Sequence, residues 1–269
     1  MNNKTARPVA FVVASTNHGS MIVNRYDYNM IDAVRGYGLG FQLLNTSSFD
    51  QPEIDLVMQL LVERRKVFGD GVVALDLGAN VGAHTVEWSK LMYGWGSIIA
   101  VEAQERIFYA LAGNVAINNC FNAKVVWGAI GNDVGFINVP VPNYLSPGSF
   151  GSMEIKQSEK NEFIGQPIDY TPEKANPTRL FTLDSLLLPR IDLIKIDIEG
   201  MEMDALNGGK KSIGQHKPIM LIEKIKTNEA DLRNFLRVAG YQIFEIGINF
   251  LAIHETDEIR NKIIRSNAK

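Results

Sequence analysis

Residues 75–82, which read LDLGANVG, constrain the fold of this chain more than any other segment. A continuous apolar run at 72–75 precedes Asp76, and glycines at 78 and 82 follow before a helical pattern begins. Strands buried on both faces of a parallel sheet have such apolar runs. Glycine lets the backbone turn into the helix and come close to a ligand. The segment therefore predicts a strand–turn–helix unit with a ligand at the turn.

The rest of the chain repeats this alternation. Strand patterns occur at 97–101, 124–130, 193–198 and 219–222, and helical patterns at 83–93, 107–118 and 231–239. Two closing strands, at 241–246 and 250–253, are joined by a turn so short that they must pair antiparallel. Strands that alternate with helices form βαβ units. We therefore predict an α/β fold with a mostly parallel, mixed sheet and helices on both faces.

A second acid follows the next predicted strand. Glu102 lies about 20 residues after the glycine turn, where a carboxylate can accept hydrogen bonds from both hydroxyls of a ribose. The turn has neither the G-x-G-x-x-G nor the phosphate-loop spacing, and Asp76 would repel a phosphate. The same carboxylate suits a cationic group. This combination favours S-adenosylmethionine (SAM) over a nicotinamide dinucleotide.

Charge and cysteine content exclude other classes. Lys and Arg number 27 against 30 Asp and Glu, so the chain lacks the strongly basic balance typical of nucleic-acid binding. Its single cysteine, Cys120, can form neither an intrachain disulfide nor a multi-thiolate zinc site. The sequence also contains no apolar stretch long enough to span a membrane. We expect a cytoplasmic protein with no nucleic-acid or membrane partner, and the sequence leaves its oligomeric state open.

Four segments together resemble the FkbM family of class I SAM-dependent methyltransferases. They are residues 76–82, 101–102, 114–118 and 193–202, the last of which reads LIKIDIEGME. The resemblance covers about residues 70–253, and its most specific part is D-x-E-G-x-E at 197–202. It implies a Rossmann-like, seven-stranded sheet with a reversed terminal strand, SAM as methyl donor, and often O-methylation of sugars or natural products. Most members have proline after the second-strand acid, where this chain has Ala103.

The predicted cofactor site follows from the strand ends and from this resemblance. The third strand ends near residues 127–129, which by position should border the adenine. The complete set of predicted cofactor residues is Asp76, Gly78, Ala79, Asn80, Gly82, Glu102, Ala103, Gly128, Ala129 and Asp197.

The fourth strand carries a row of charged residues. Alternation places Lys195, Asp197 and Glu199 on one side of it. Such a row on an inner strand is costly unless it is paired or functional. We predict Lys195 to be an ion-pair partner of Asp76 or Glu223.

A hydroxyl acceptor benefits from a general base. The predicted catalytic residues are Asp197, Glu199 and His84, which begins the helix after the glycine turn. Glu202 and Glu223 are predicted to bind substrate, and Glu223 is a further candidate base. Alternatively, Glu202 only complements the helix dipole, and His84 only packs beside the cofactor. The three acids Asp197, Glu199 and Glu223 also permit, without requiring, a divalent metal site like that of catechol O-methyltransferases.

The remaining segments define the expected organisation. Residues 1–50 form an N-terminal extension with a β-hairpin at 9–13 and 21–23, and 51–269 form the methyltransferase domain, which starts with a helix. Residues 138–180, rich in Pro, Gly and Ser, are an irregular insertion that we predict to be a substrate lid.

Two other functions remain open from the sequence. One is a binding module that keeps this fold without catalysis, and the other is a nicotinamide-dependent dehydrogenase. The acceptor and its reacting atom cannot be identified from the residues alone.

Overall fold

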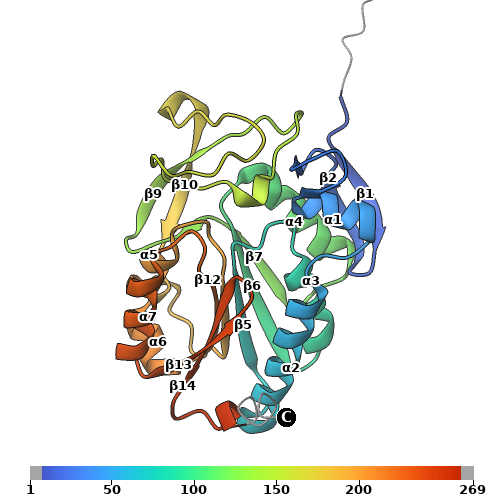
Figure 1. The fold of residues 1–269 in the computed structure, drawn as a ribbon. Coiled ribbons are helices and arrows are strands. Elements are labelled where there is room, and N and C mark those ends of the chain that lie inside the picture. The colour runs from blue at the N-terminus through green and yellow to red at the C-terminus, as the bar shows by residue number, and fades with distance from the viewer. Residues whose placement is uncertain (1–7, 262–269) are drawn as a thin grey trace, which may run out of the picture.

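A seven-stranded mixed sheet forms the centre of the protein in the computed structural model, which describes residues 8–261 (Figure 1). The strand order is β13-β14-β12-β11-β5-β6-β7, and only β14 runs against the others. The strands are β5 (Val72–Leu77), β6 (Gly96–Glu102), β7 (Ala123–Trp127), β11 (Leu193–Ile196), β12 (Ile219–Glu223), β13 (Tyr241–Ile246) and β14 (Asn249–His254). The predicted antiparallel closing pair and the reversed terminal strand are confirmed.

Helices cover both faces of this sheet. One face carries α2 (Gln51–Phe68), α3 (Ala83–Met92) and α4 (Glu105–Ile117), and the other carries α5 (Glu202–Asn207), α6 (Lys210–His216) and α7 (Glu229–Val238). Right-handed crossovers require this arrangement, because the chain moves from β5 toward β7 first and then from β11 toward β13. No helix within residues 8–261 combines the length and apolar character needed to cross a bilayer.

The two faces confirm the alternation predicted along β11. Leu193 packs in the core beneath α2 and α3, whereas Ile194 and Ile196 pack in the core beneath α5, α6 and α7. Lys195 therefore projects on the same side as Leu193. This places the charged row on the side of the sheet that also carries the glycine turn.

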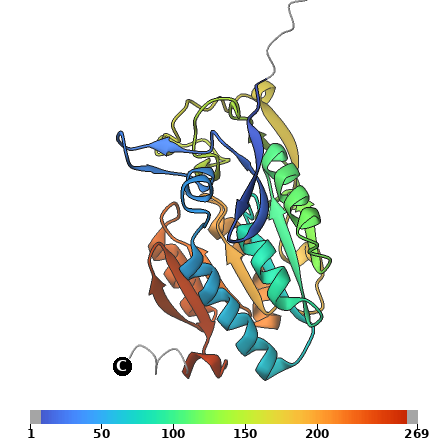
Figure 2. The same cartoon turned by 90° about the vertical axis from the view of Figure 1, so that its right-hand side faces the viewer.

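The N-terminal extension packs against the body of the protein beside α4 (Figure 2). It contains β1 (Phe11–Thr16), β2 (Gly19–Asn24), β3 (Asn29–Met30), β4 (Gly36–Tyr37) and α1 (Leu39–Thr46). Met21 and Leu43 share an apolar core with Val81 of the glycine turn. The side chain of Asn114 accepts a hydrogen bond from Ile22 N and donates one to Val81 O. The extension therefore supports the turn from behind.

The predicted insertion begins and ends in regular structure. A small sheet of order β8-β10-β9 contains β8 (Ala129–Ile130), β9 (Gly135–Pro140) and β10 (Ala175–Phe181). The predicted strand at 124–130 is therefore two strands in different sheets, because the chain leaves the large sheet at Gly128. Residues 141–174 form the irregular part, with short 3₁₀ turns at Phe150–Ser152 and Pro172–Lys174. These loops lie over the carboxyl ends of the parallel strands (Figure 1).

Candidate active site

A cavity of about 250 Å³ lies where β5, β6, β11 and β12 end. Open α/β sheets bind ligands at this edge. Its walls come from several distant parts of the chain, among them the N-terminal extension, the glycine turn, the end of β6, the insertion, and the ends of β11 and β12.

Most of the predicted site residues line this one cavity. They are Asp76, Gly78, Ala79, Asn80, His84, Glu102, Ala103, Gly128, Ala129, Asp197, Glu199 and Glu223. Gly82 and Glu202 lie outside it. The fold therefore brings together predicted site residues that are far apart along the chain. The positions of Gly82 and Glu202 have structural explanations, which are given below.

The two glycines of the turn are explained by the protein's own packing. Gly78 has φ of +80°, and a Cβ there would lie 1.7 Å from the carbonyl oxygen of Asp197. Gly82 has φ of +88°, and its Cβ would lie 2.5 Å from a methyl group of Leu111 in α4. Both positions thus require glycine independently of any ligand. Their effect is to present Ala79 and Asn80 to the cavity.

Glu102 is held in place by backbone donors. It is 6% exposed, its Oε2 accepts a hydrogen bond from Asn80 N at 3.0 Å, and its Oε1 accepts one from Gln104 N at 2.8 Å. Burial raises the pKa of this carboxyl to about 7, although these hydrogen bonds act in the opposite direction. Each oxygen retains a lone pair. Glu102 therefore both ties β6 to the glycine turn and offers two fixed acceptors to a ligand.

Asp76 presents an oxygen that has no protein partner. The residue is 1% exposed and accepts a hydrogen bond from the Thr85 hydroxyl through Oδ2 at 2.6 Å. Its Oδ1 is buried and has no hydrogen-bond partner in residues 8–261. Burial raises the pKa of the carboxyl, against the stabilising charge of Lys195. A buried acceptor without a donor is costly, so this oxygen is available to a cationic or hydrogen-bonding ligand.

The ion pair of Lys195 differs from the prediction. Its Nζ lies 2.7 Å from Oδ2 of Asp197 on the same strand face, and neither Asp76 nor Glu223 is within ion-pair distance. Burial disfavours the ammonium charge, but the carboxylates of Asp197, Asp76 and Glu53 together raise its pKa above the usual value. Lys195 therefore stays charged at the base of the acidic row.

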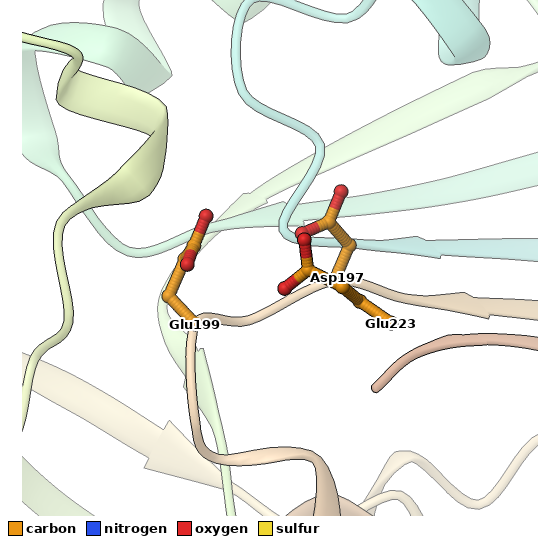
Figure 3. Close-up of side chains that lie close together, drawn as sticks. All are labelled: Asp197, Glu199 and Glu223. Carbon is orange, nitrogen blue, oxygen red and sulfur yellow. The ribbon is translucent and has the colours of Figure 1, made fainter. Parts of the chain in front are cut away.

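Three carboxyl groups lie close together at the carboxyl ends of β11 and β12 (Figure 3). Asp197, Glu199 and Glu223 each offer an oxygen, and these oxygens lie within 4.8 Å of one another. Burial, reinforced by the neighbouring acids, raises the pKa of Glu223 to about 8 and moves that of Glu199 in the same direction. Glu199 has φ of +54°, an unusual conformation for a residue other than glycine. The cluster is thus built at a strained turn with mutually repelling acids.

Lys226 joins this cluster to the insertion. Its Nζ lies 2.7 Å from Oε2 of Glu199 and 2.9 Å from Oε2 of Glu162, and it donates a hydrogen bond to Ser152 O at 2.6 Å. Glu162 also accepts a hydrogen bond from the Tyr37 hydroxyl at 2.7 Å. One ammonium group therefore fixes the insertion over the acidic end of the cavity.

Glu202 supports the turn instead of facing the cavity. It is fully buried, and its Oε1 accepts hydrogen bonds from the backbone N of Ile198 and Gly200 at 3.2 and 3.1 Å. As the first residue of α5, it also complements the helix dipole. This geometry agrees with the alternative that the sequence left open for Glu202.

His84 is buried in the wall of the cavity, and its ring is neutral. It is 4% exposed, its ring packs edge-on against Trp88 at 5.3 Å, and neither ring nitrogen has a hydrogen-bond partner within the described chain. Burial, helped by the positive charge of Lys195, holds its pKa well below the usual value. The nearest acid is Glu53, whose Oε1 lies 3.4 Å from Nε2.

Sequence reasoning missed the contribution of the N-terminal extension. Tyr37, Gln42, Phe49 and Asp50 line the cavity. They come from a stretch without clear hydrophobic periodicity, and their only signal is an unusual density of Tyr, Asn and Gly. The extension therefore completes the site in addition to supporting it.

Comparison with known proteins identifies the family of this chain. The family profile of the methyltransferase FkbM domain matches residues 76–243. Methyltransferase 1 from Beauveria bassiana (strain ARSEF 2860) is 25% identical over 150 residues, which span 52% of this chain but only 59% of that relative.

Two solved structures are also similar. The FkbM methyltransferase from Methylobacillus flagellatus KT is 19% identical, with 69% of this chain and 44% of that chain covered and a TM-score of 0.49. The precorrin-6y C5,15-methyltransferase from Geobacter metallireducens GS-15 is 14% identical, with 78% and 89% covered and a TM-score of 0.41.

Proposed function

The chain belongs to the FkbM methyltransferase family and has the class I, Rossmann-like fold, and from this premise we propose that it transfers a methyl group from SAM to a hydroxyl group of a small molecule or glycan. The observation that carries the proposal is the unpartnered Oδ1 of Asp76, buried in the wall of the cavity at the glycine turn. This oxygen fits the amino group of SAM, which is a cation with hydrogens to donate.

The residues at the glycine turn fit the rest of the cofactor. The carboxylate of Glu102 would accept hydrogen bonds from the ribose hydroxyls, because each of its oxygens has one lone pair left after binding a backbone N–H. Ala103, Gly128 and Ala129 line the same side of the cavity and would border the adenine. When bound, SAM supplies an electrophilic methyl group on a sulfonium.

The opposite end of the cavity would take the acceptor. Asp197 and Glu199 lie there as acidic groups that can orient a hydroxyl and, in the ionised form, take its proton. His84 offers a second base, because its low pKa leaves the ring neutral and its nitrogens are unpartnered. The insertion, fixed by Lys226, would exclude water from an acceptor held beneath it.

The acidic cavity disfavours the dehydrogenase alternative. A dinucleotide must seat its pyrophosphate at a helix N-terminus, whereas Asp76 and Asp50 line the cavity beside the start of α3. A binding module would bind the cofactor in the same cavity but would transfer no methyl group.

Calorimetric titration with S-adenosylhomocysteine and with NADH separates these functions. We expect binding of the former only, followed by a mass increase of one methyl group in a screen of hydroxylated acceptors with SAM. Binding of NADH alone would overturn the proposal. S-adenosylhomocysteine binding without a methylated product from any acceptor would favour the binding module.

A further inference from the structure

We propose that Asp197, Glu199 and Glu223 bind a divalent cation of the oxygen-preferring class, Mg²⁺ or Mn²⁺, at the acceptor end of the cavity. Their carboxylate oxygens lie within 4.8 Å of one another, so one ion can contact all three. Figure 3 shows the three side chains close together, two from the segment that follows β11 and one from the end of β12. Carboxylates and water are the ligands that Mg²⁺ and Mn²⁺ prefer.

Glu223 supplies an observation beyond the clustering of acids. Its side chain is buried, with 7% of the residue exposed, and its Oε2 has no hydrogen-bond partner in residues 8–261. No lysine, arginine or histidine of the described chain lies within ion-pair distance of it. A buried carboxylate oxygen without a donor carries a desolvation cost that a ligand would remove. The Glu223 side chain lies close to those of the other two acids (Figure 3).

The two nearby lysines leave room for the ion. Lys195 lies against Oδ2 of Asp197, and Lys226 lies against Oε2 of Glu199. The second oxygen of each carboxylate is not used by either pair. A cation bound to these second oxygens and to Glu223 would therefore displace neither ammonium group.

The charge around the cluster also favours a further cation. Lys195 pairs with Asp197, and Lys226 pairs with both Glu199 and Glu162. Negative groups thus outnumber the positive ones even before Glu223 is counted. In a buried site with low effective dielectric, such an excess attracts a counterion.

The role of the ion rests on the proposed function. An oxygen-preferring cation at this end of the cavity would bind two neighbouring oxygens of the acceptor, such as a vicinal diol, and would lower the pKa of a bound hydroxyl. Binding of the ion itself does not depend on methyl transfer. Failure of the cation site is therefore distinguishable from failure of the proposed methyl transfer.

Titration of the full-length protein with MnCl₂ alone tests the site, with free Mn²⁺ measured by electron paramagnetic resonance. We expect one ion per wild-type chain, displacement by excess Mg²⁺, and affinity weaker by about tenfold or more in Glu223→Gln and in Asp197→Asn. The matched control is Glu245→Gln, which removes one acid whose partners are Lys224 and Arg233, away from the cavity. It should bind as the wild type does.

Circular dichroism and cooperative urea unfolding establish that each variant is folded. Two results would overturn the site, namely no Mn²⁺ bound at millimolar concentration, or equal affinity in the wild type and a folded Glu223→Gln. Should Glu223→Gln not fold, Asp197→Asn decides in the same way. S-adenosylhomocysteine binding without Mn²⁺ binding would remove this inference and leave the proposed function standing.

Discussion

Glu102 and Glu223 each end a strand at the same edge of the sheet, yet the surroundings of their two carboxyl groups are opposite in kind. Glu102 accepts backbone hydrogen bonds through both oxygens, whereas Glu223 keeps a buried oxygen without a partner and faces two more acids. The first arrangement fixes a carboxylate before any ligand arrives. The arrangement around Glu223 leaves an acidic group that only a bound ligand or ion would stabilise. We infer that the Glu102 half of the cavity holds the cofactor and the Glu223 half holds the acceptor.

The largest expected effect concerns the acceptor half. Asp197→Asn and Glu199→Gln should each lower turnover by about 10²-fold or more, because each removes a charged group that orients or deprotonates the acceptor. The affinity for S-adenosylhomocysteine should fall less in Glu199→Gln, since only Asp197 adjoins the glycine turn through its contact with Gly78. Mass-detected turnover and calorimetry on both variants measure this. Full turnover in both variants would exclude these acids as the general base and leave His84 as the candidate.

The next effect concerns Gly78, where the glycine turn of the cofactor half approaches the backbone of Asp197 in the acceptor half. Gly78→Ala should destabilise the fold by about 3 kcal/mol, since it combines a strained φ with overlap on the carbonyl of Asp197. Gly69→Ala is the matched control, because Gly69 also has positive φ but no atom within 4 Å of its Cβ position. It should cost about 1 kcal/mol. Urea unfolding measures both, and equal values would contradict the close approach.

A smaller effect is expected in the cofactor half. Glu102→Gln should weaken S-adenosylhomocysteine binding by about 1.5–3 kcal/mol, or about 10–150-fold, because it removes a charge-assisted acceptor from the ribose. Glu105→Gln serves as the control, since Glu105 is bound to Tyr109 and Asn176 outside this cavity. Unchanged affinity in folded Glu102→Gln would remove the ribose assignment.

The smallest effect is a pH dependence. The ribose hydroxyls would donate to the ionised form of Glu102, whose pKa lies at about 7 because of burial. The affinity of the wild type should therefore rise by up to about tenfold from pH 6 to pH 8, as the carboxyl loses its proton. The same titration of Glu102→Gln should be nearly flat. An affinity that falls with rising pH would contradict the sign of this linkage.

The strands, and the position of Asp76 and Glu102 at one cavity, were predictable because local patterns specify the strand ends. Apolar runs that end in an acid or a glycine turn mark the carboxyl ends of strands, and Asp76 and Glu102 both line the cavity at such ends. The carboxyl ends of parallel strands lie together at one edge of the sheet. Sequence position therefore sufficed to bring these residues together.

Other features depend on contacts that local patterns do not encode. Residues 24–49 have no clear hydrophobic period, so α1 and the cavity-lining Tyr37 were not predicted. The partner of Lys195 depends on how far its flexible side chain reaches, and the structure pairs it with Asp197. Glu202 belongs to the same motif as Asp197, yet it turns toward backbone N–H groups. A motif thus identifies a region, but side-chain direction requires the fold.

A crystal structure of the protein with S-adenosylhomocysteine would show directly whether the two halves have the roles inferred for them. The expected result places the ribose hydroxyls against the carboxylate of Glu102 and the amino group against Oδ1 of Asp76, with Glu199 and Glu223 left facing open cavity. A nucleoside bound instead among Asp197, Glu199 and Glu223, with Glu102 free of contact, would contradict the division between cofactor and acceptor halves.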